Sequence, residues 1–200
     1  MTKLFIFTLS YLFYSCSGSS TGPENTELPL IQNYQFNIDE DSQLVSTLPK
    51  TNNSSRGLTY TIKTNPLNGQ VNIIAGDFIY TPNLNFFGEE TFNYSISNND
   101  KSTEDGTVSI NIRPINDAPI VEENINFFVT TGDNFLTLTG FDVDNDNLFF
   151  RITSFTGSGS LEIDLLNQVK YNGPGNTFFD YVANDGTVDS NKGRVSIIPQ

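Results

Sequence analysis

Hydrophobic and polar residues alternate along much of the chain beyond residue 33. Every second side chain is apolar in residues 34–38, and the same pattern returns at 58–62, 92–96 and 108–112. A period of two with a single apolar face is typical of strands in antiparallel sheets that face water on one side. We therefore expect these segments to be strands.

Extending this pattern along the chain predicts two sets of seven strands, separated by turn residues such as Asn68-Gly69. The first set is 34–38, 44–48, 58–62, 71–73, 78–80, 92–96 and 108–112, and the second is 125–130, 135–139, 148–153, 160–164, 168–172, 177–183 and 193–198. No segment after the first fifteen residues shows helical periodicity, so the predicted class is all-β.

The two sets of strands are copies of one another. The Phe-Asn-Tyr of residues 92–94 returns as Phe-Asp-Tyr at 179–181, and the Thr-Val-Ser-Ile of 107–110 returns as Arg-Val-Ser-Ile at 194–197. A period of about 87–90 residues is too long for a solenoid unit and fits one small β-sandwich. The predicted architecture is therefore two tandem seven-stranded Greek-key β-sandwiches of the immunoglobulin type.

The first fifteen residues have the character of a secretory signal. Lys3 gives a positive start, residues 4–14 are apolar, and Ser15 precedes Cys16, the single cysteine of the chain. The apolar run is too short to span a membrane as a helix. Cys16 stands where a bacterial lipoprotein signal places its lipidated cysteine, which predicts lipidation there. An ordinary cleaved signal with an unrelated cysteine nearby is the alternative.

The organisation that follows is a signal peptide at 1–15, a flexible tether at 16–33, and two repeats at 34–117 and 118–200. The tether is assigned because its small polar residues, Gly and Pro bury nothing. A lipid on Cys16 would attach the chain to a membrane outside the cytoplasm, as an outer-membrane or cell-surface lipoprotein. Without the lipid the chain would be secreted.

Composition narrows the range of partners. The chain has 10 basic and 23 acidic residues, a formal charge of −13, which argues against nucleic acid as a partner because phosphates need a basic face. Calcium is a better partner than nucleic acid for such an acidic surface, and a need for solubility alone is the simpler explanation of the charge.

The chain has no His, so His-based catalytic triads and His-ligated zinc are excluded. One cysteine cannot form an internal disulfide, so the repeats hold together by packing.

The clearest chemical motif is the Asp-Val-Asp-Asn-Asp-Asn of residues 142–147. Alternate carboxylates on a short loop can converge on a hard cation such as Ca²⁺, which prefers several oxygen ligands. The motif is not an EF-hand, because Asn147 replaces the required Gly and Thr153 replaces the required Glu. Taken alone, this motif is better explained as an empty, solvated Asp/Asn-rich turn.

Three further motifs place this loop in a wider context. Residues 78–82 read Phe-Ile-Tyr-Thr-Pro, residues 87–94 read Phe-Gly-Glu-Glu-Thr-Phe-Asn-Tyr, and residues 116–119 read Asn-Asp-Ala-Pro. With these motifs the chain resembles the bacterial cadherin-like tandem repeats of large surface proteins. The resemblance covers about residues 34–200 and is closer in the first repeat than in the second.

The resemblance implies a calcium site at the junction between the repeats. The residues that match the family's ligand positions are Glu40 or Asp41, Asn116, Asp117, Asp142, Asp144 and Asp185, with Asp146 as a further ligand or only a turn residue. The Asp-Arg-Glu element that cadherins add to this site has no match. Residues 51–57 lack the Asp-x-Asp pattern, so no second site of this kind is expected near the tether.

The predicted function is that of a non-enzymatic adhesion or structural module at the cell surface. Calcium would stiffen the junction between its repeats, and its partner would be an unidentified surface protein or glycan. Neighbouring acidic residues such as Glu89-Glu90 point to opposite faces of a strand, so they do not form a catalytic pair. The alternative is a carbohydrate-binding accessory module of a larger secreted or surface protein. Such a module would use exposed aromatics from the Phe-Phe pairs at 127–128, 149–150 and 178–179.

Overall fold

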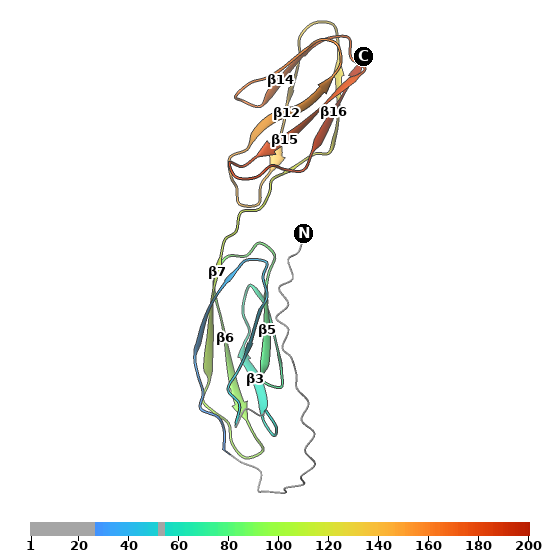
Figure 1. Cartoon of the computed structure of the whole chain (residues 1–200). Coiled ribbons are helices and arrows are strands. Elements are labelled where there is room, and N and C mark those ends of the chain that lie inside the picture. The colour runs from blue at the N-terminus through green and yellow to red at the C-terminus, as the bar shows by residue number, and fades with distance from the viewer. Residues whose placement is uncertain (1–26, 52–54) are drawn as a thin grey trace, which may run out of the picture.

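The computed structural model describes residues 27–51 and 55–200, and within them sixteen strands and no helix form two bodies stacked end to end (Figure 1). The all-β prediction is confirmed. The expected signal peptide at 1–15 and the lipidation site at Cys16 lie outside the described residues. Among the residues described, no helix has the length and apolar character needed to cross a membrane.

The first body contains seven strands in two sheets. They are β1 (Tyr34–Asp39), β2 (Leu44–Thr47), β3 (Thr59–Thr64), β4 (Gly69–Ile74), β5 (Asp77–Pro82), β6 (Gly88–Ser97) and β7 (Gly106–Arg113). One sheet has the order β1-β7-β6-β3 and the other the order β2-β5-β4. All neighbouring strands are antiparallel except β1 and β7, which run parallel toward the second body.

The second body repeats this plan and adds one small strand pair. Its strands are β8 (Ile120–Val121), β9 (Asn124–Val129), β10 (Asn134–Thr137), β11 (Gly140–Phe141), β12 (Phe149–Thr156), β13 (Ser160–Ile163), β14 (Gln168–Asn172), β15 (Thr177–Asn184) and β16 (Gly193–Pro199). The sheets have the orders β12-β15-β16-β9 and β10-β14-β13, and β9 runs parallel to β16. The β8–β11 pair was not predicted, because two residues are too few to show a period of two.

Each body encloses a hydrophobic core of its own. In β5, Phe78 and Tyr80 are fully buried, while in β6 Phe92 and Tyr94 face them from the opposite sheet. The corresponding second core contains β15 and β16 residues together with Val169 and Tyr171 of β14. The alternation of apolar and polar residues therefore sorts side chains between core and solvent as the sequence predicts.

A tyrosine and a glycine are paired at the same place in both cores. The Tyr94 hydroxyl donates to the Gln32 carbonyl at 2.7 Å, and Gly106 lies directly opposite Tyr94 on β7. A Cβ at Gly106 would lie 2.7 Å from the Tyr94 ring, so the ring needs a glycine there. The second copy repeats the arrangement with Tyr181, whose hydroxyl donates to the Glu122 carbonyl at 3.0 Å, opposite Gly193.

The end of the expected tether lies against the first body. Besides the bond from Tyr94 to Gln32, the Asn33 side chain accepts a hydrogen bond from the Thr107 amide at 2.8 Å. Ile31 packs against the first core. Residues 31–33 are thus held by contacts that the alternation of residues does not reveal.

One buried ion cluster distinguishes the second copy from the first. Asp180 is 3% exposed although it lies between Phe179 and Tyr181 and so points to the outer face of its sheet. Arg194 contacts one carboxylate oxygen at 2.7 Å, and Lys192 contacts the other at 2.7 Å. The hydrogen bond from Arg194, and to a smaller extent the one from Lys192, holds the pKa of Asp180 well below its usual range.

We expect Asp180→Asn to lower the free energy of unfolding at neutral pH by about 2 kcal/mol, the contribution typical of hydrogen bonds to a charged group. Because the folded pKa is depressed, this stability is present above the unfolded pKa of about 4 and is lost as the pH falls below it. Denaturant unfolding at pH 7 and at about pH 2 checks this, since the difference from wild type should shrink in acid. As a control, Asp189→Asn removes an exposed pair with Arg151 and should change stability much less.

Candidate metal centre at the seam between the repeats

The candidate ligands gather at the seam, which we define as the facing ends of the two bodies and the linker of residues 114–119. The strands explain this placement. Parallel strands β1 and β7 both end there, and so does β15, whose last residue Asn184 pairs with Phe149 at the start of β12. The loops before β12 and after β15 therefore face the β1–β2 connection across the linker (Figure 1).

Asp142, Asp144 and Asp146 form a compact carboxylate cluster, with one oxygen of each lying within 4.8 Å of the others. Asp142 is 6% exposed, and its Oδ1 accepts hydrogen bonds from the amides of Asp144 at 2.9 Å and Asp146 at 3.2 Å. The loop thus wraps around the Asp142 side chain. Its Oδ2 is buried and has no hydrogen-bond partner in the described part of the chain.

Asp117 of the linker joins this cluster. Its amide donates to Asp144 Oδ2 at 2.8 Å, and its own Oδ2 is buried without a partner among the described residues. Burial raises the pKa of the Asp117 carboxyl, and the negative charges of Asp41, Asp144 and Asp142 raise it further. Asp117 thus lies within electrostatic reach of carboxylates from both repeats.

Glu40 and Asp41 of the first repeat make hydrogen bonds on its side of the seam. Glu40 is buried, and its Oε1 accepts a hydrogen bond from the Ile115 amide, so it fixes the linker to the first body. Asp41 has a positive φ of 58°, and its Oδ1 accepts from the Asn85 amide at 2.9 Å. In the described part of the chain, no hydrogen bond reaches the second oxygen of either carboxylate.

Asp185 and Asn116 form the second attachment of the linker. Asn116 Nδ2 donates to Asp185 Oδ2 at 2.8 Å, while Asp185 Oδ1 accepts from the amides of Thr187 at 2.6 Å and Val188 at 2.7 Å. The hydrogen bond from Asn116 is the main cause that lowers the pKa of Asp185. Both oxygens of Asp185 are therefore engaged, so in this arrangement Asp185 anchors the linker rather than presenting a free ligand.

The structure thus divides the expected ligands into two groups. Asp142, Asp144 and Asp146 converge, with Asp117 and Asp41 near them, whereas Glu40, Asn116 and Asp185 use oxygen or nitrogen atoms to hold the linker. Asp117 Oδ2 and Asp142 Oδ2 are buried without partners in the described part of the chain, and a hard cation would satisfy them, because desolvated carboxylates need a compensating partner. The donor set, which is made of oxygens only, fits calcium.

The exposed aromatics of the carbohydrate alternative do not gather on one sheet face. In each Phe-Phe pair one ring enters the core or its edge, and the outward rings of Phe128 and Phe149 lie near opposite ends of the second body. The third outward ring, Phe178, lies beneath the Arg194 guanidinium, 4.0 Å from it.

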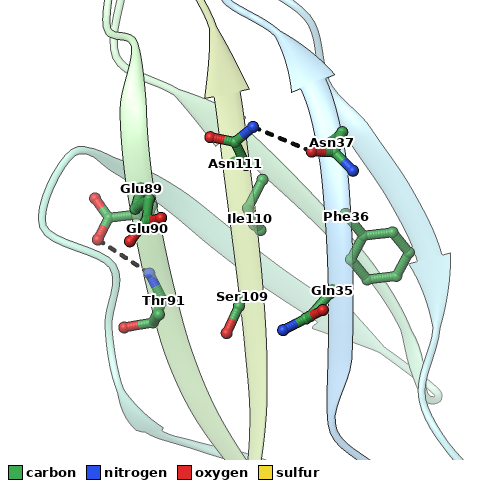
Figure 2. A pocket seen from close by; sticks show the side chains of 9 residues that line it. All are labelled: Gln35, Phe36, Asn37, Glu89, Glu90, Thr91, Ser109, Ile110 and Asn111. Atoms are coloured by element: carbon green, nitrogen blue, oxygen red, sulfur yellow. Dashed lines mark hydrogen bonds between the residues drawn. The ribbon is translucent and has the colours of Figure 1, made fainter.

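A shallow depression of about 330 Å³ lies on the outer face of β1, β7 and β6 (Figure 2). Its polar lining consists of Gln35, Asn37, Glu89, Glu90, Thr91, Ser109 and Asn111. Its apolar members, Phe36 and Ile110, belong to the first core. The depression therefore offers hydrogen-bonding groups without an exposed aromatic surface.

Comparison with known proteins agrees with this architecture. Residues 26–111 match the family model of the bacterial Ig domain. Human CDH23 EC21-23 aligns with a TM-score of 0.55 at 15% identity, covering 87% of this chain and 70% of that one. Human mucin-like protocadherin EC1-2 aligns with a TM-score of 0.51 at 14% identity, covering 86% and 99%. At such identities the likeness concerns the fold.

A hydrolase also aligns with this chain, with a lower TM-score. The endo-fucoidan hydrolase MfFcnA4 of glycoside hydrolase family 107 aligns at 16% identity with a TM-score of 0.37. The alignment covers 90% of this chain, which spans only 30% of that hydrolase. No curated protein matches the sequence.

Proposed function

We propose that this chain, a bacterial Ig-like and cadherin-like repeat protein, is a surface module whose two repeats are locked in line by calcium at the seam. Domains of this kind are extracellular or surface modules without catalytic activity of their own. The observation that carries the calcium proposal is the pair of buried oxygens without partners, Asp117 Oδ2 and Asp142 Oδ2. One belongs to the linker and the other to the second repeat.

The contacts around these oxygens explain how a cation would stiffen the seam. The linker is already tied to the first body through Glu40 and to the second through Asp185. Between these ties, Asp117 faces carboxylates that repel it, which favours opening of the seam. A divalent cation reverses the sign of this interaction, because it attracts the linker carboxylate and the loop carboxylates together.

We further propose that the module is displayed outside the cytoplasm by a lipid on Cys16. The support is the charged, apolar and small-residue pattern of residues 3–15 directly before that cysteine. Mass spectrometry of the mature N-terminus tests the anchor, because an unmodified Cys16 at that position would refute it.

Calcium should couple the tumbling of the two repeats in solution. We expect ¹⁵N relaxation to give one common rotational correlation time with calcium, and two shorter, different times after chelation, because the metal-free linker can bend. Glu104→Ala, which removes an exposed acid beyond the far end of β6, should behave as wild type. Identical relaxation with calcium and with chelator would refute stiffening by the metal.

A further inference from the structure

A second candidate binding site lies on the seam-facing end of the second repeat. A cavity of about 460 Å³ opens beside the Asp142–Asp146 loop, between that loop and the turn that joins β13 to β14. It is wide open to solvent, and its lining contains both polar and apolar side chains.

The polar lining consists of Thr139, Asp142 and three further side chains from two separate loops. Asn145 and Asp146 come from the loop before β12, and Asn167 comes from the β13–β14 turn. None of the three side chains makes a hydrogen bond within the part of the chain that the structure describes. Asn145 and Asn167 have positive φ angles of 63° and 61°, which accounts for asparagine in these turns but not for the convergence of both amides on one cavity.

The apolar lining provides an exposed aromatic ring. Phe141 of β11 lines the cavity and is 62% exposed, while Leu148 and Phe150 are partly buried against the second core behind it. The cavity therefore combines an accessible aromatic surface with two amides and the carboxylates of Asp142 and Asp146. Amides both donate and accept hydrogen bonds, whereas a carboxylate accepts them.

We propose that this cavity binds a neutral sugar. A pyranose ring has an apolar C–H face that can stack on Phe141, and hydroxyl groups that can pair with Asn145, Asp146 and Asn167. The formal charge of −13 and the carboxylates in the cavity disfavour sugars that carry carboxylate or sulfate groups. The depression of Figure 2 lacks the aromatic surface, so it does not compete as a site of this kind.

The sugar site adjoins the proposed calcium site, because Asp142 and Asp146 line the cavity and are also candidate calcium ligands. The calcium proposal rests on the unpartnered oxygens of Asp117 and Asp142, whereas the sugar is held mainly by Phe141 and two asparagines that are not among the candidate ligands. Measurements with calcium and with chelator therefore separate the two proposals, because the melting temperature reports the metal and sugar binding reports the cavity.

Saturation-transfer difference NMR on the full chain tests the site, using the methyl glycosides of glucose, galactose and mannose at millimolar concentration. We expect at least one of them to bind, with the strongest transfer to the C–H groups of one ring face. Phe141→Ala should weaken binding about tenfold, the effect of losing one stacking contact. Phe149→Ala is the matched control, because Phe149 is 65% exposed at the same end but does not line the cavity.

Asp146→Asn provides a second variant that keeps the shape of the side chain. It should weaken the binding of the neutral glycoside while the melting temperature without calcium stays close to that of wild type. The proposal is wrong if none of the three glycosides binds, if Phe149→Ala weakens binding as much as Phe141→Ala, or if methyl glucuronide binds more tightly than methyl glucoside.

Discussion

We expect calcium to raise the melting temperature of this chain, and Asp144→Ala to remove that rise. At a calcium concentration one hundred times the dissociation constant, binding adds about 2.7 kcal/mol to the free energy of unfolding. For a domain of under 100 residues this corresponds to an increase of roughly 10 °C or more in melting temperature. Calorimetry in calcium and in chelator measures the difference directly.

The comparison must use the calcium-induced gain rather than the absolute melting temperature. Asp144 Oδ2 accepts the Asp117 amide, so the alanine variant also loses a linker contact and is less stable without metal. Glu104→Ala, an exposed change far from the seam, should keep the full gain. A gain that persists in Asp144→Ala would place the cation elsewhere, and no gain in wild type would refute the site.

Tyr94→Ala should unfold the first repeat and leave the second folded. Tyr94 is fully buried in the first core, and replacing a large buried aromatic by alanine costs about 3–5 kcal/mol. A domain of this size is near the lower limit for a self-sufficient core, so the loss is a large fraction of its stability. In amide NMR spectra, the dispersed signals of the second repeat should remain while those of the first collapse.

Tyr181→Ala gives the reciprocal experiment, because Tyr181 occupies the same place in the second core. Tyr94→Phe keeps the ring and removes only the hydrogen bond to Gln32, so it should cost about 1 kcal/mol. Loss of both sets of signals in either alanine variant would mean that the repeats unfold as one cooperative unit.

Most strands of both repeats were predictable because apolar and polar residues alternate along them. Phe92 and Tyr94 illustrate this, since they reappear as Phe179 and Tyr181 in the same buried positions. The β8–β11 pair was missed because its pairing depends on where Gly140 and Phe141 meet Ile120 and Val121 in space. The docking of Gln32 was missed for a similar reason, since it rests on a hydroxyl 62 residues away.

The gathering of the candidate ligands at the seam was predictable from the sequence, but the hydrogen bonds of each residue were not. The sequence places Asp185 among the ligands, yet the amides of Thr187 and Val188 occupy one of its oxygens, and backbone donors of this kind leave no trace in a sequence motif. The proposed sugar cavity could not be predicted from the sequence. Asn167 and Phe141 are far apart along the chain and meet only through the packing of β11 beside the β13–β14 turn.

The parallel pairing of β1 with β7 and of β9 with β16 determines how a stretched rod would carry load. A pull on the two ends of the first repeat draws β1 and β7 in opposite directions along their length, because the chain enters at the far end of β1 and leaves at the seam end of β7. The hydrogen bonds between these strands then bear the force side by side in shear, instead of breaking one after another like a zipper. The β9–β16 ladder repeats this arrangement, so tension passing through the seam meets the same shear-loaded clamp on either side.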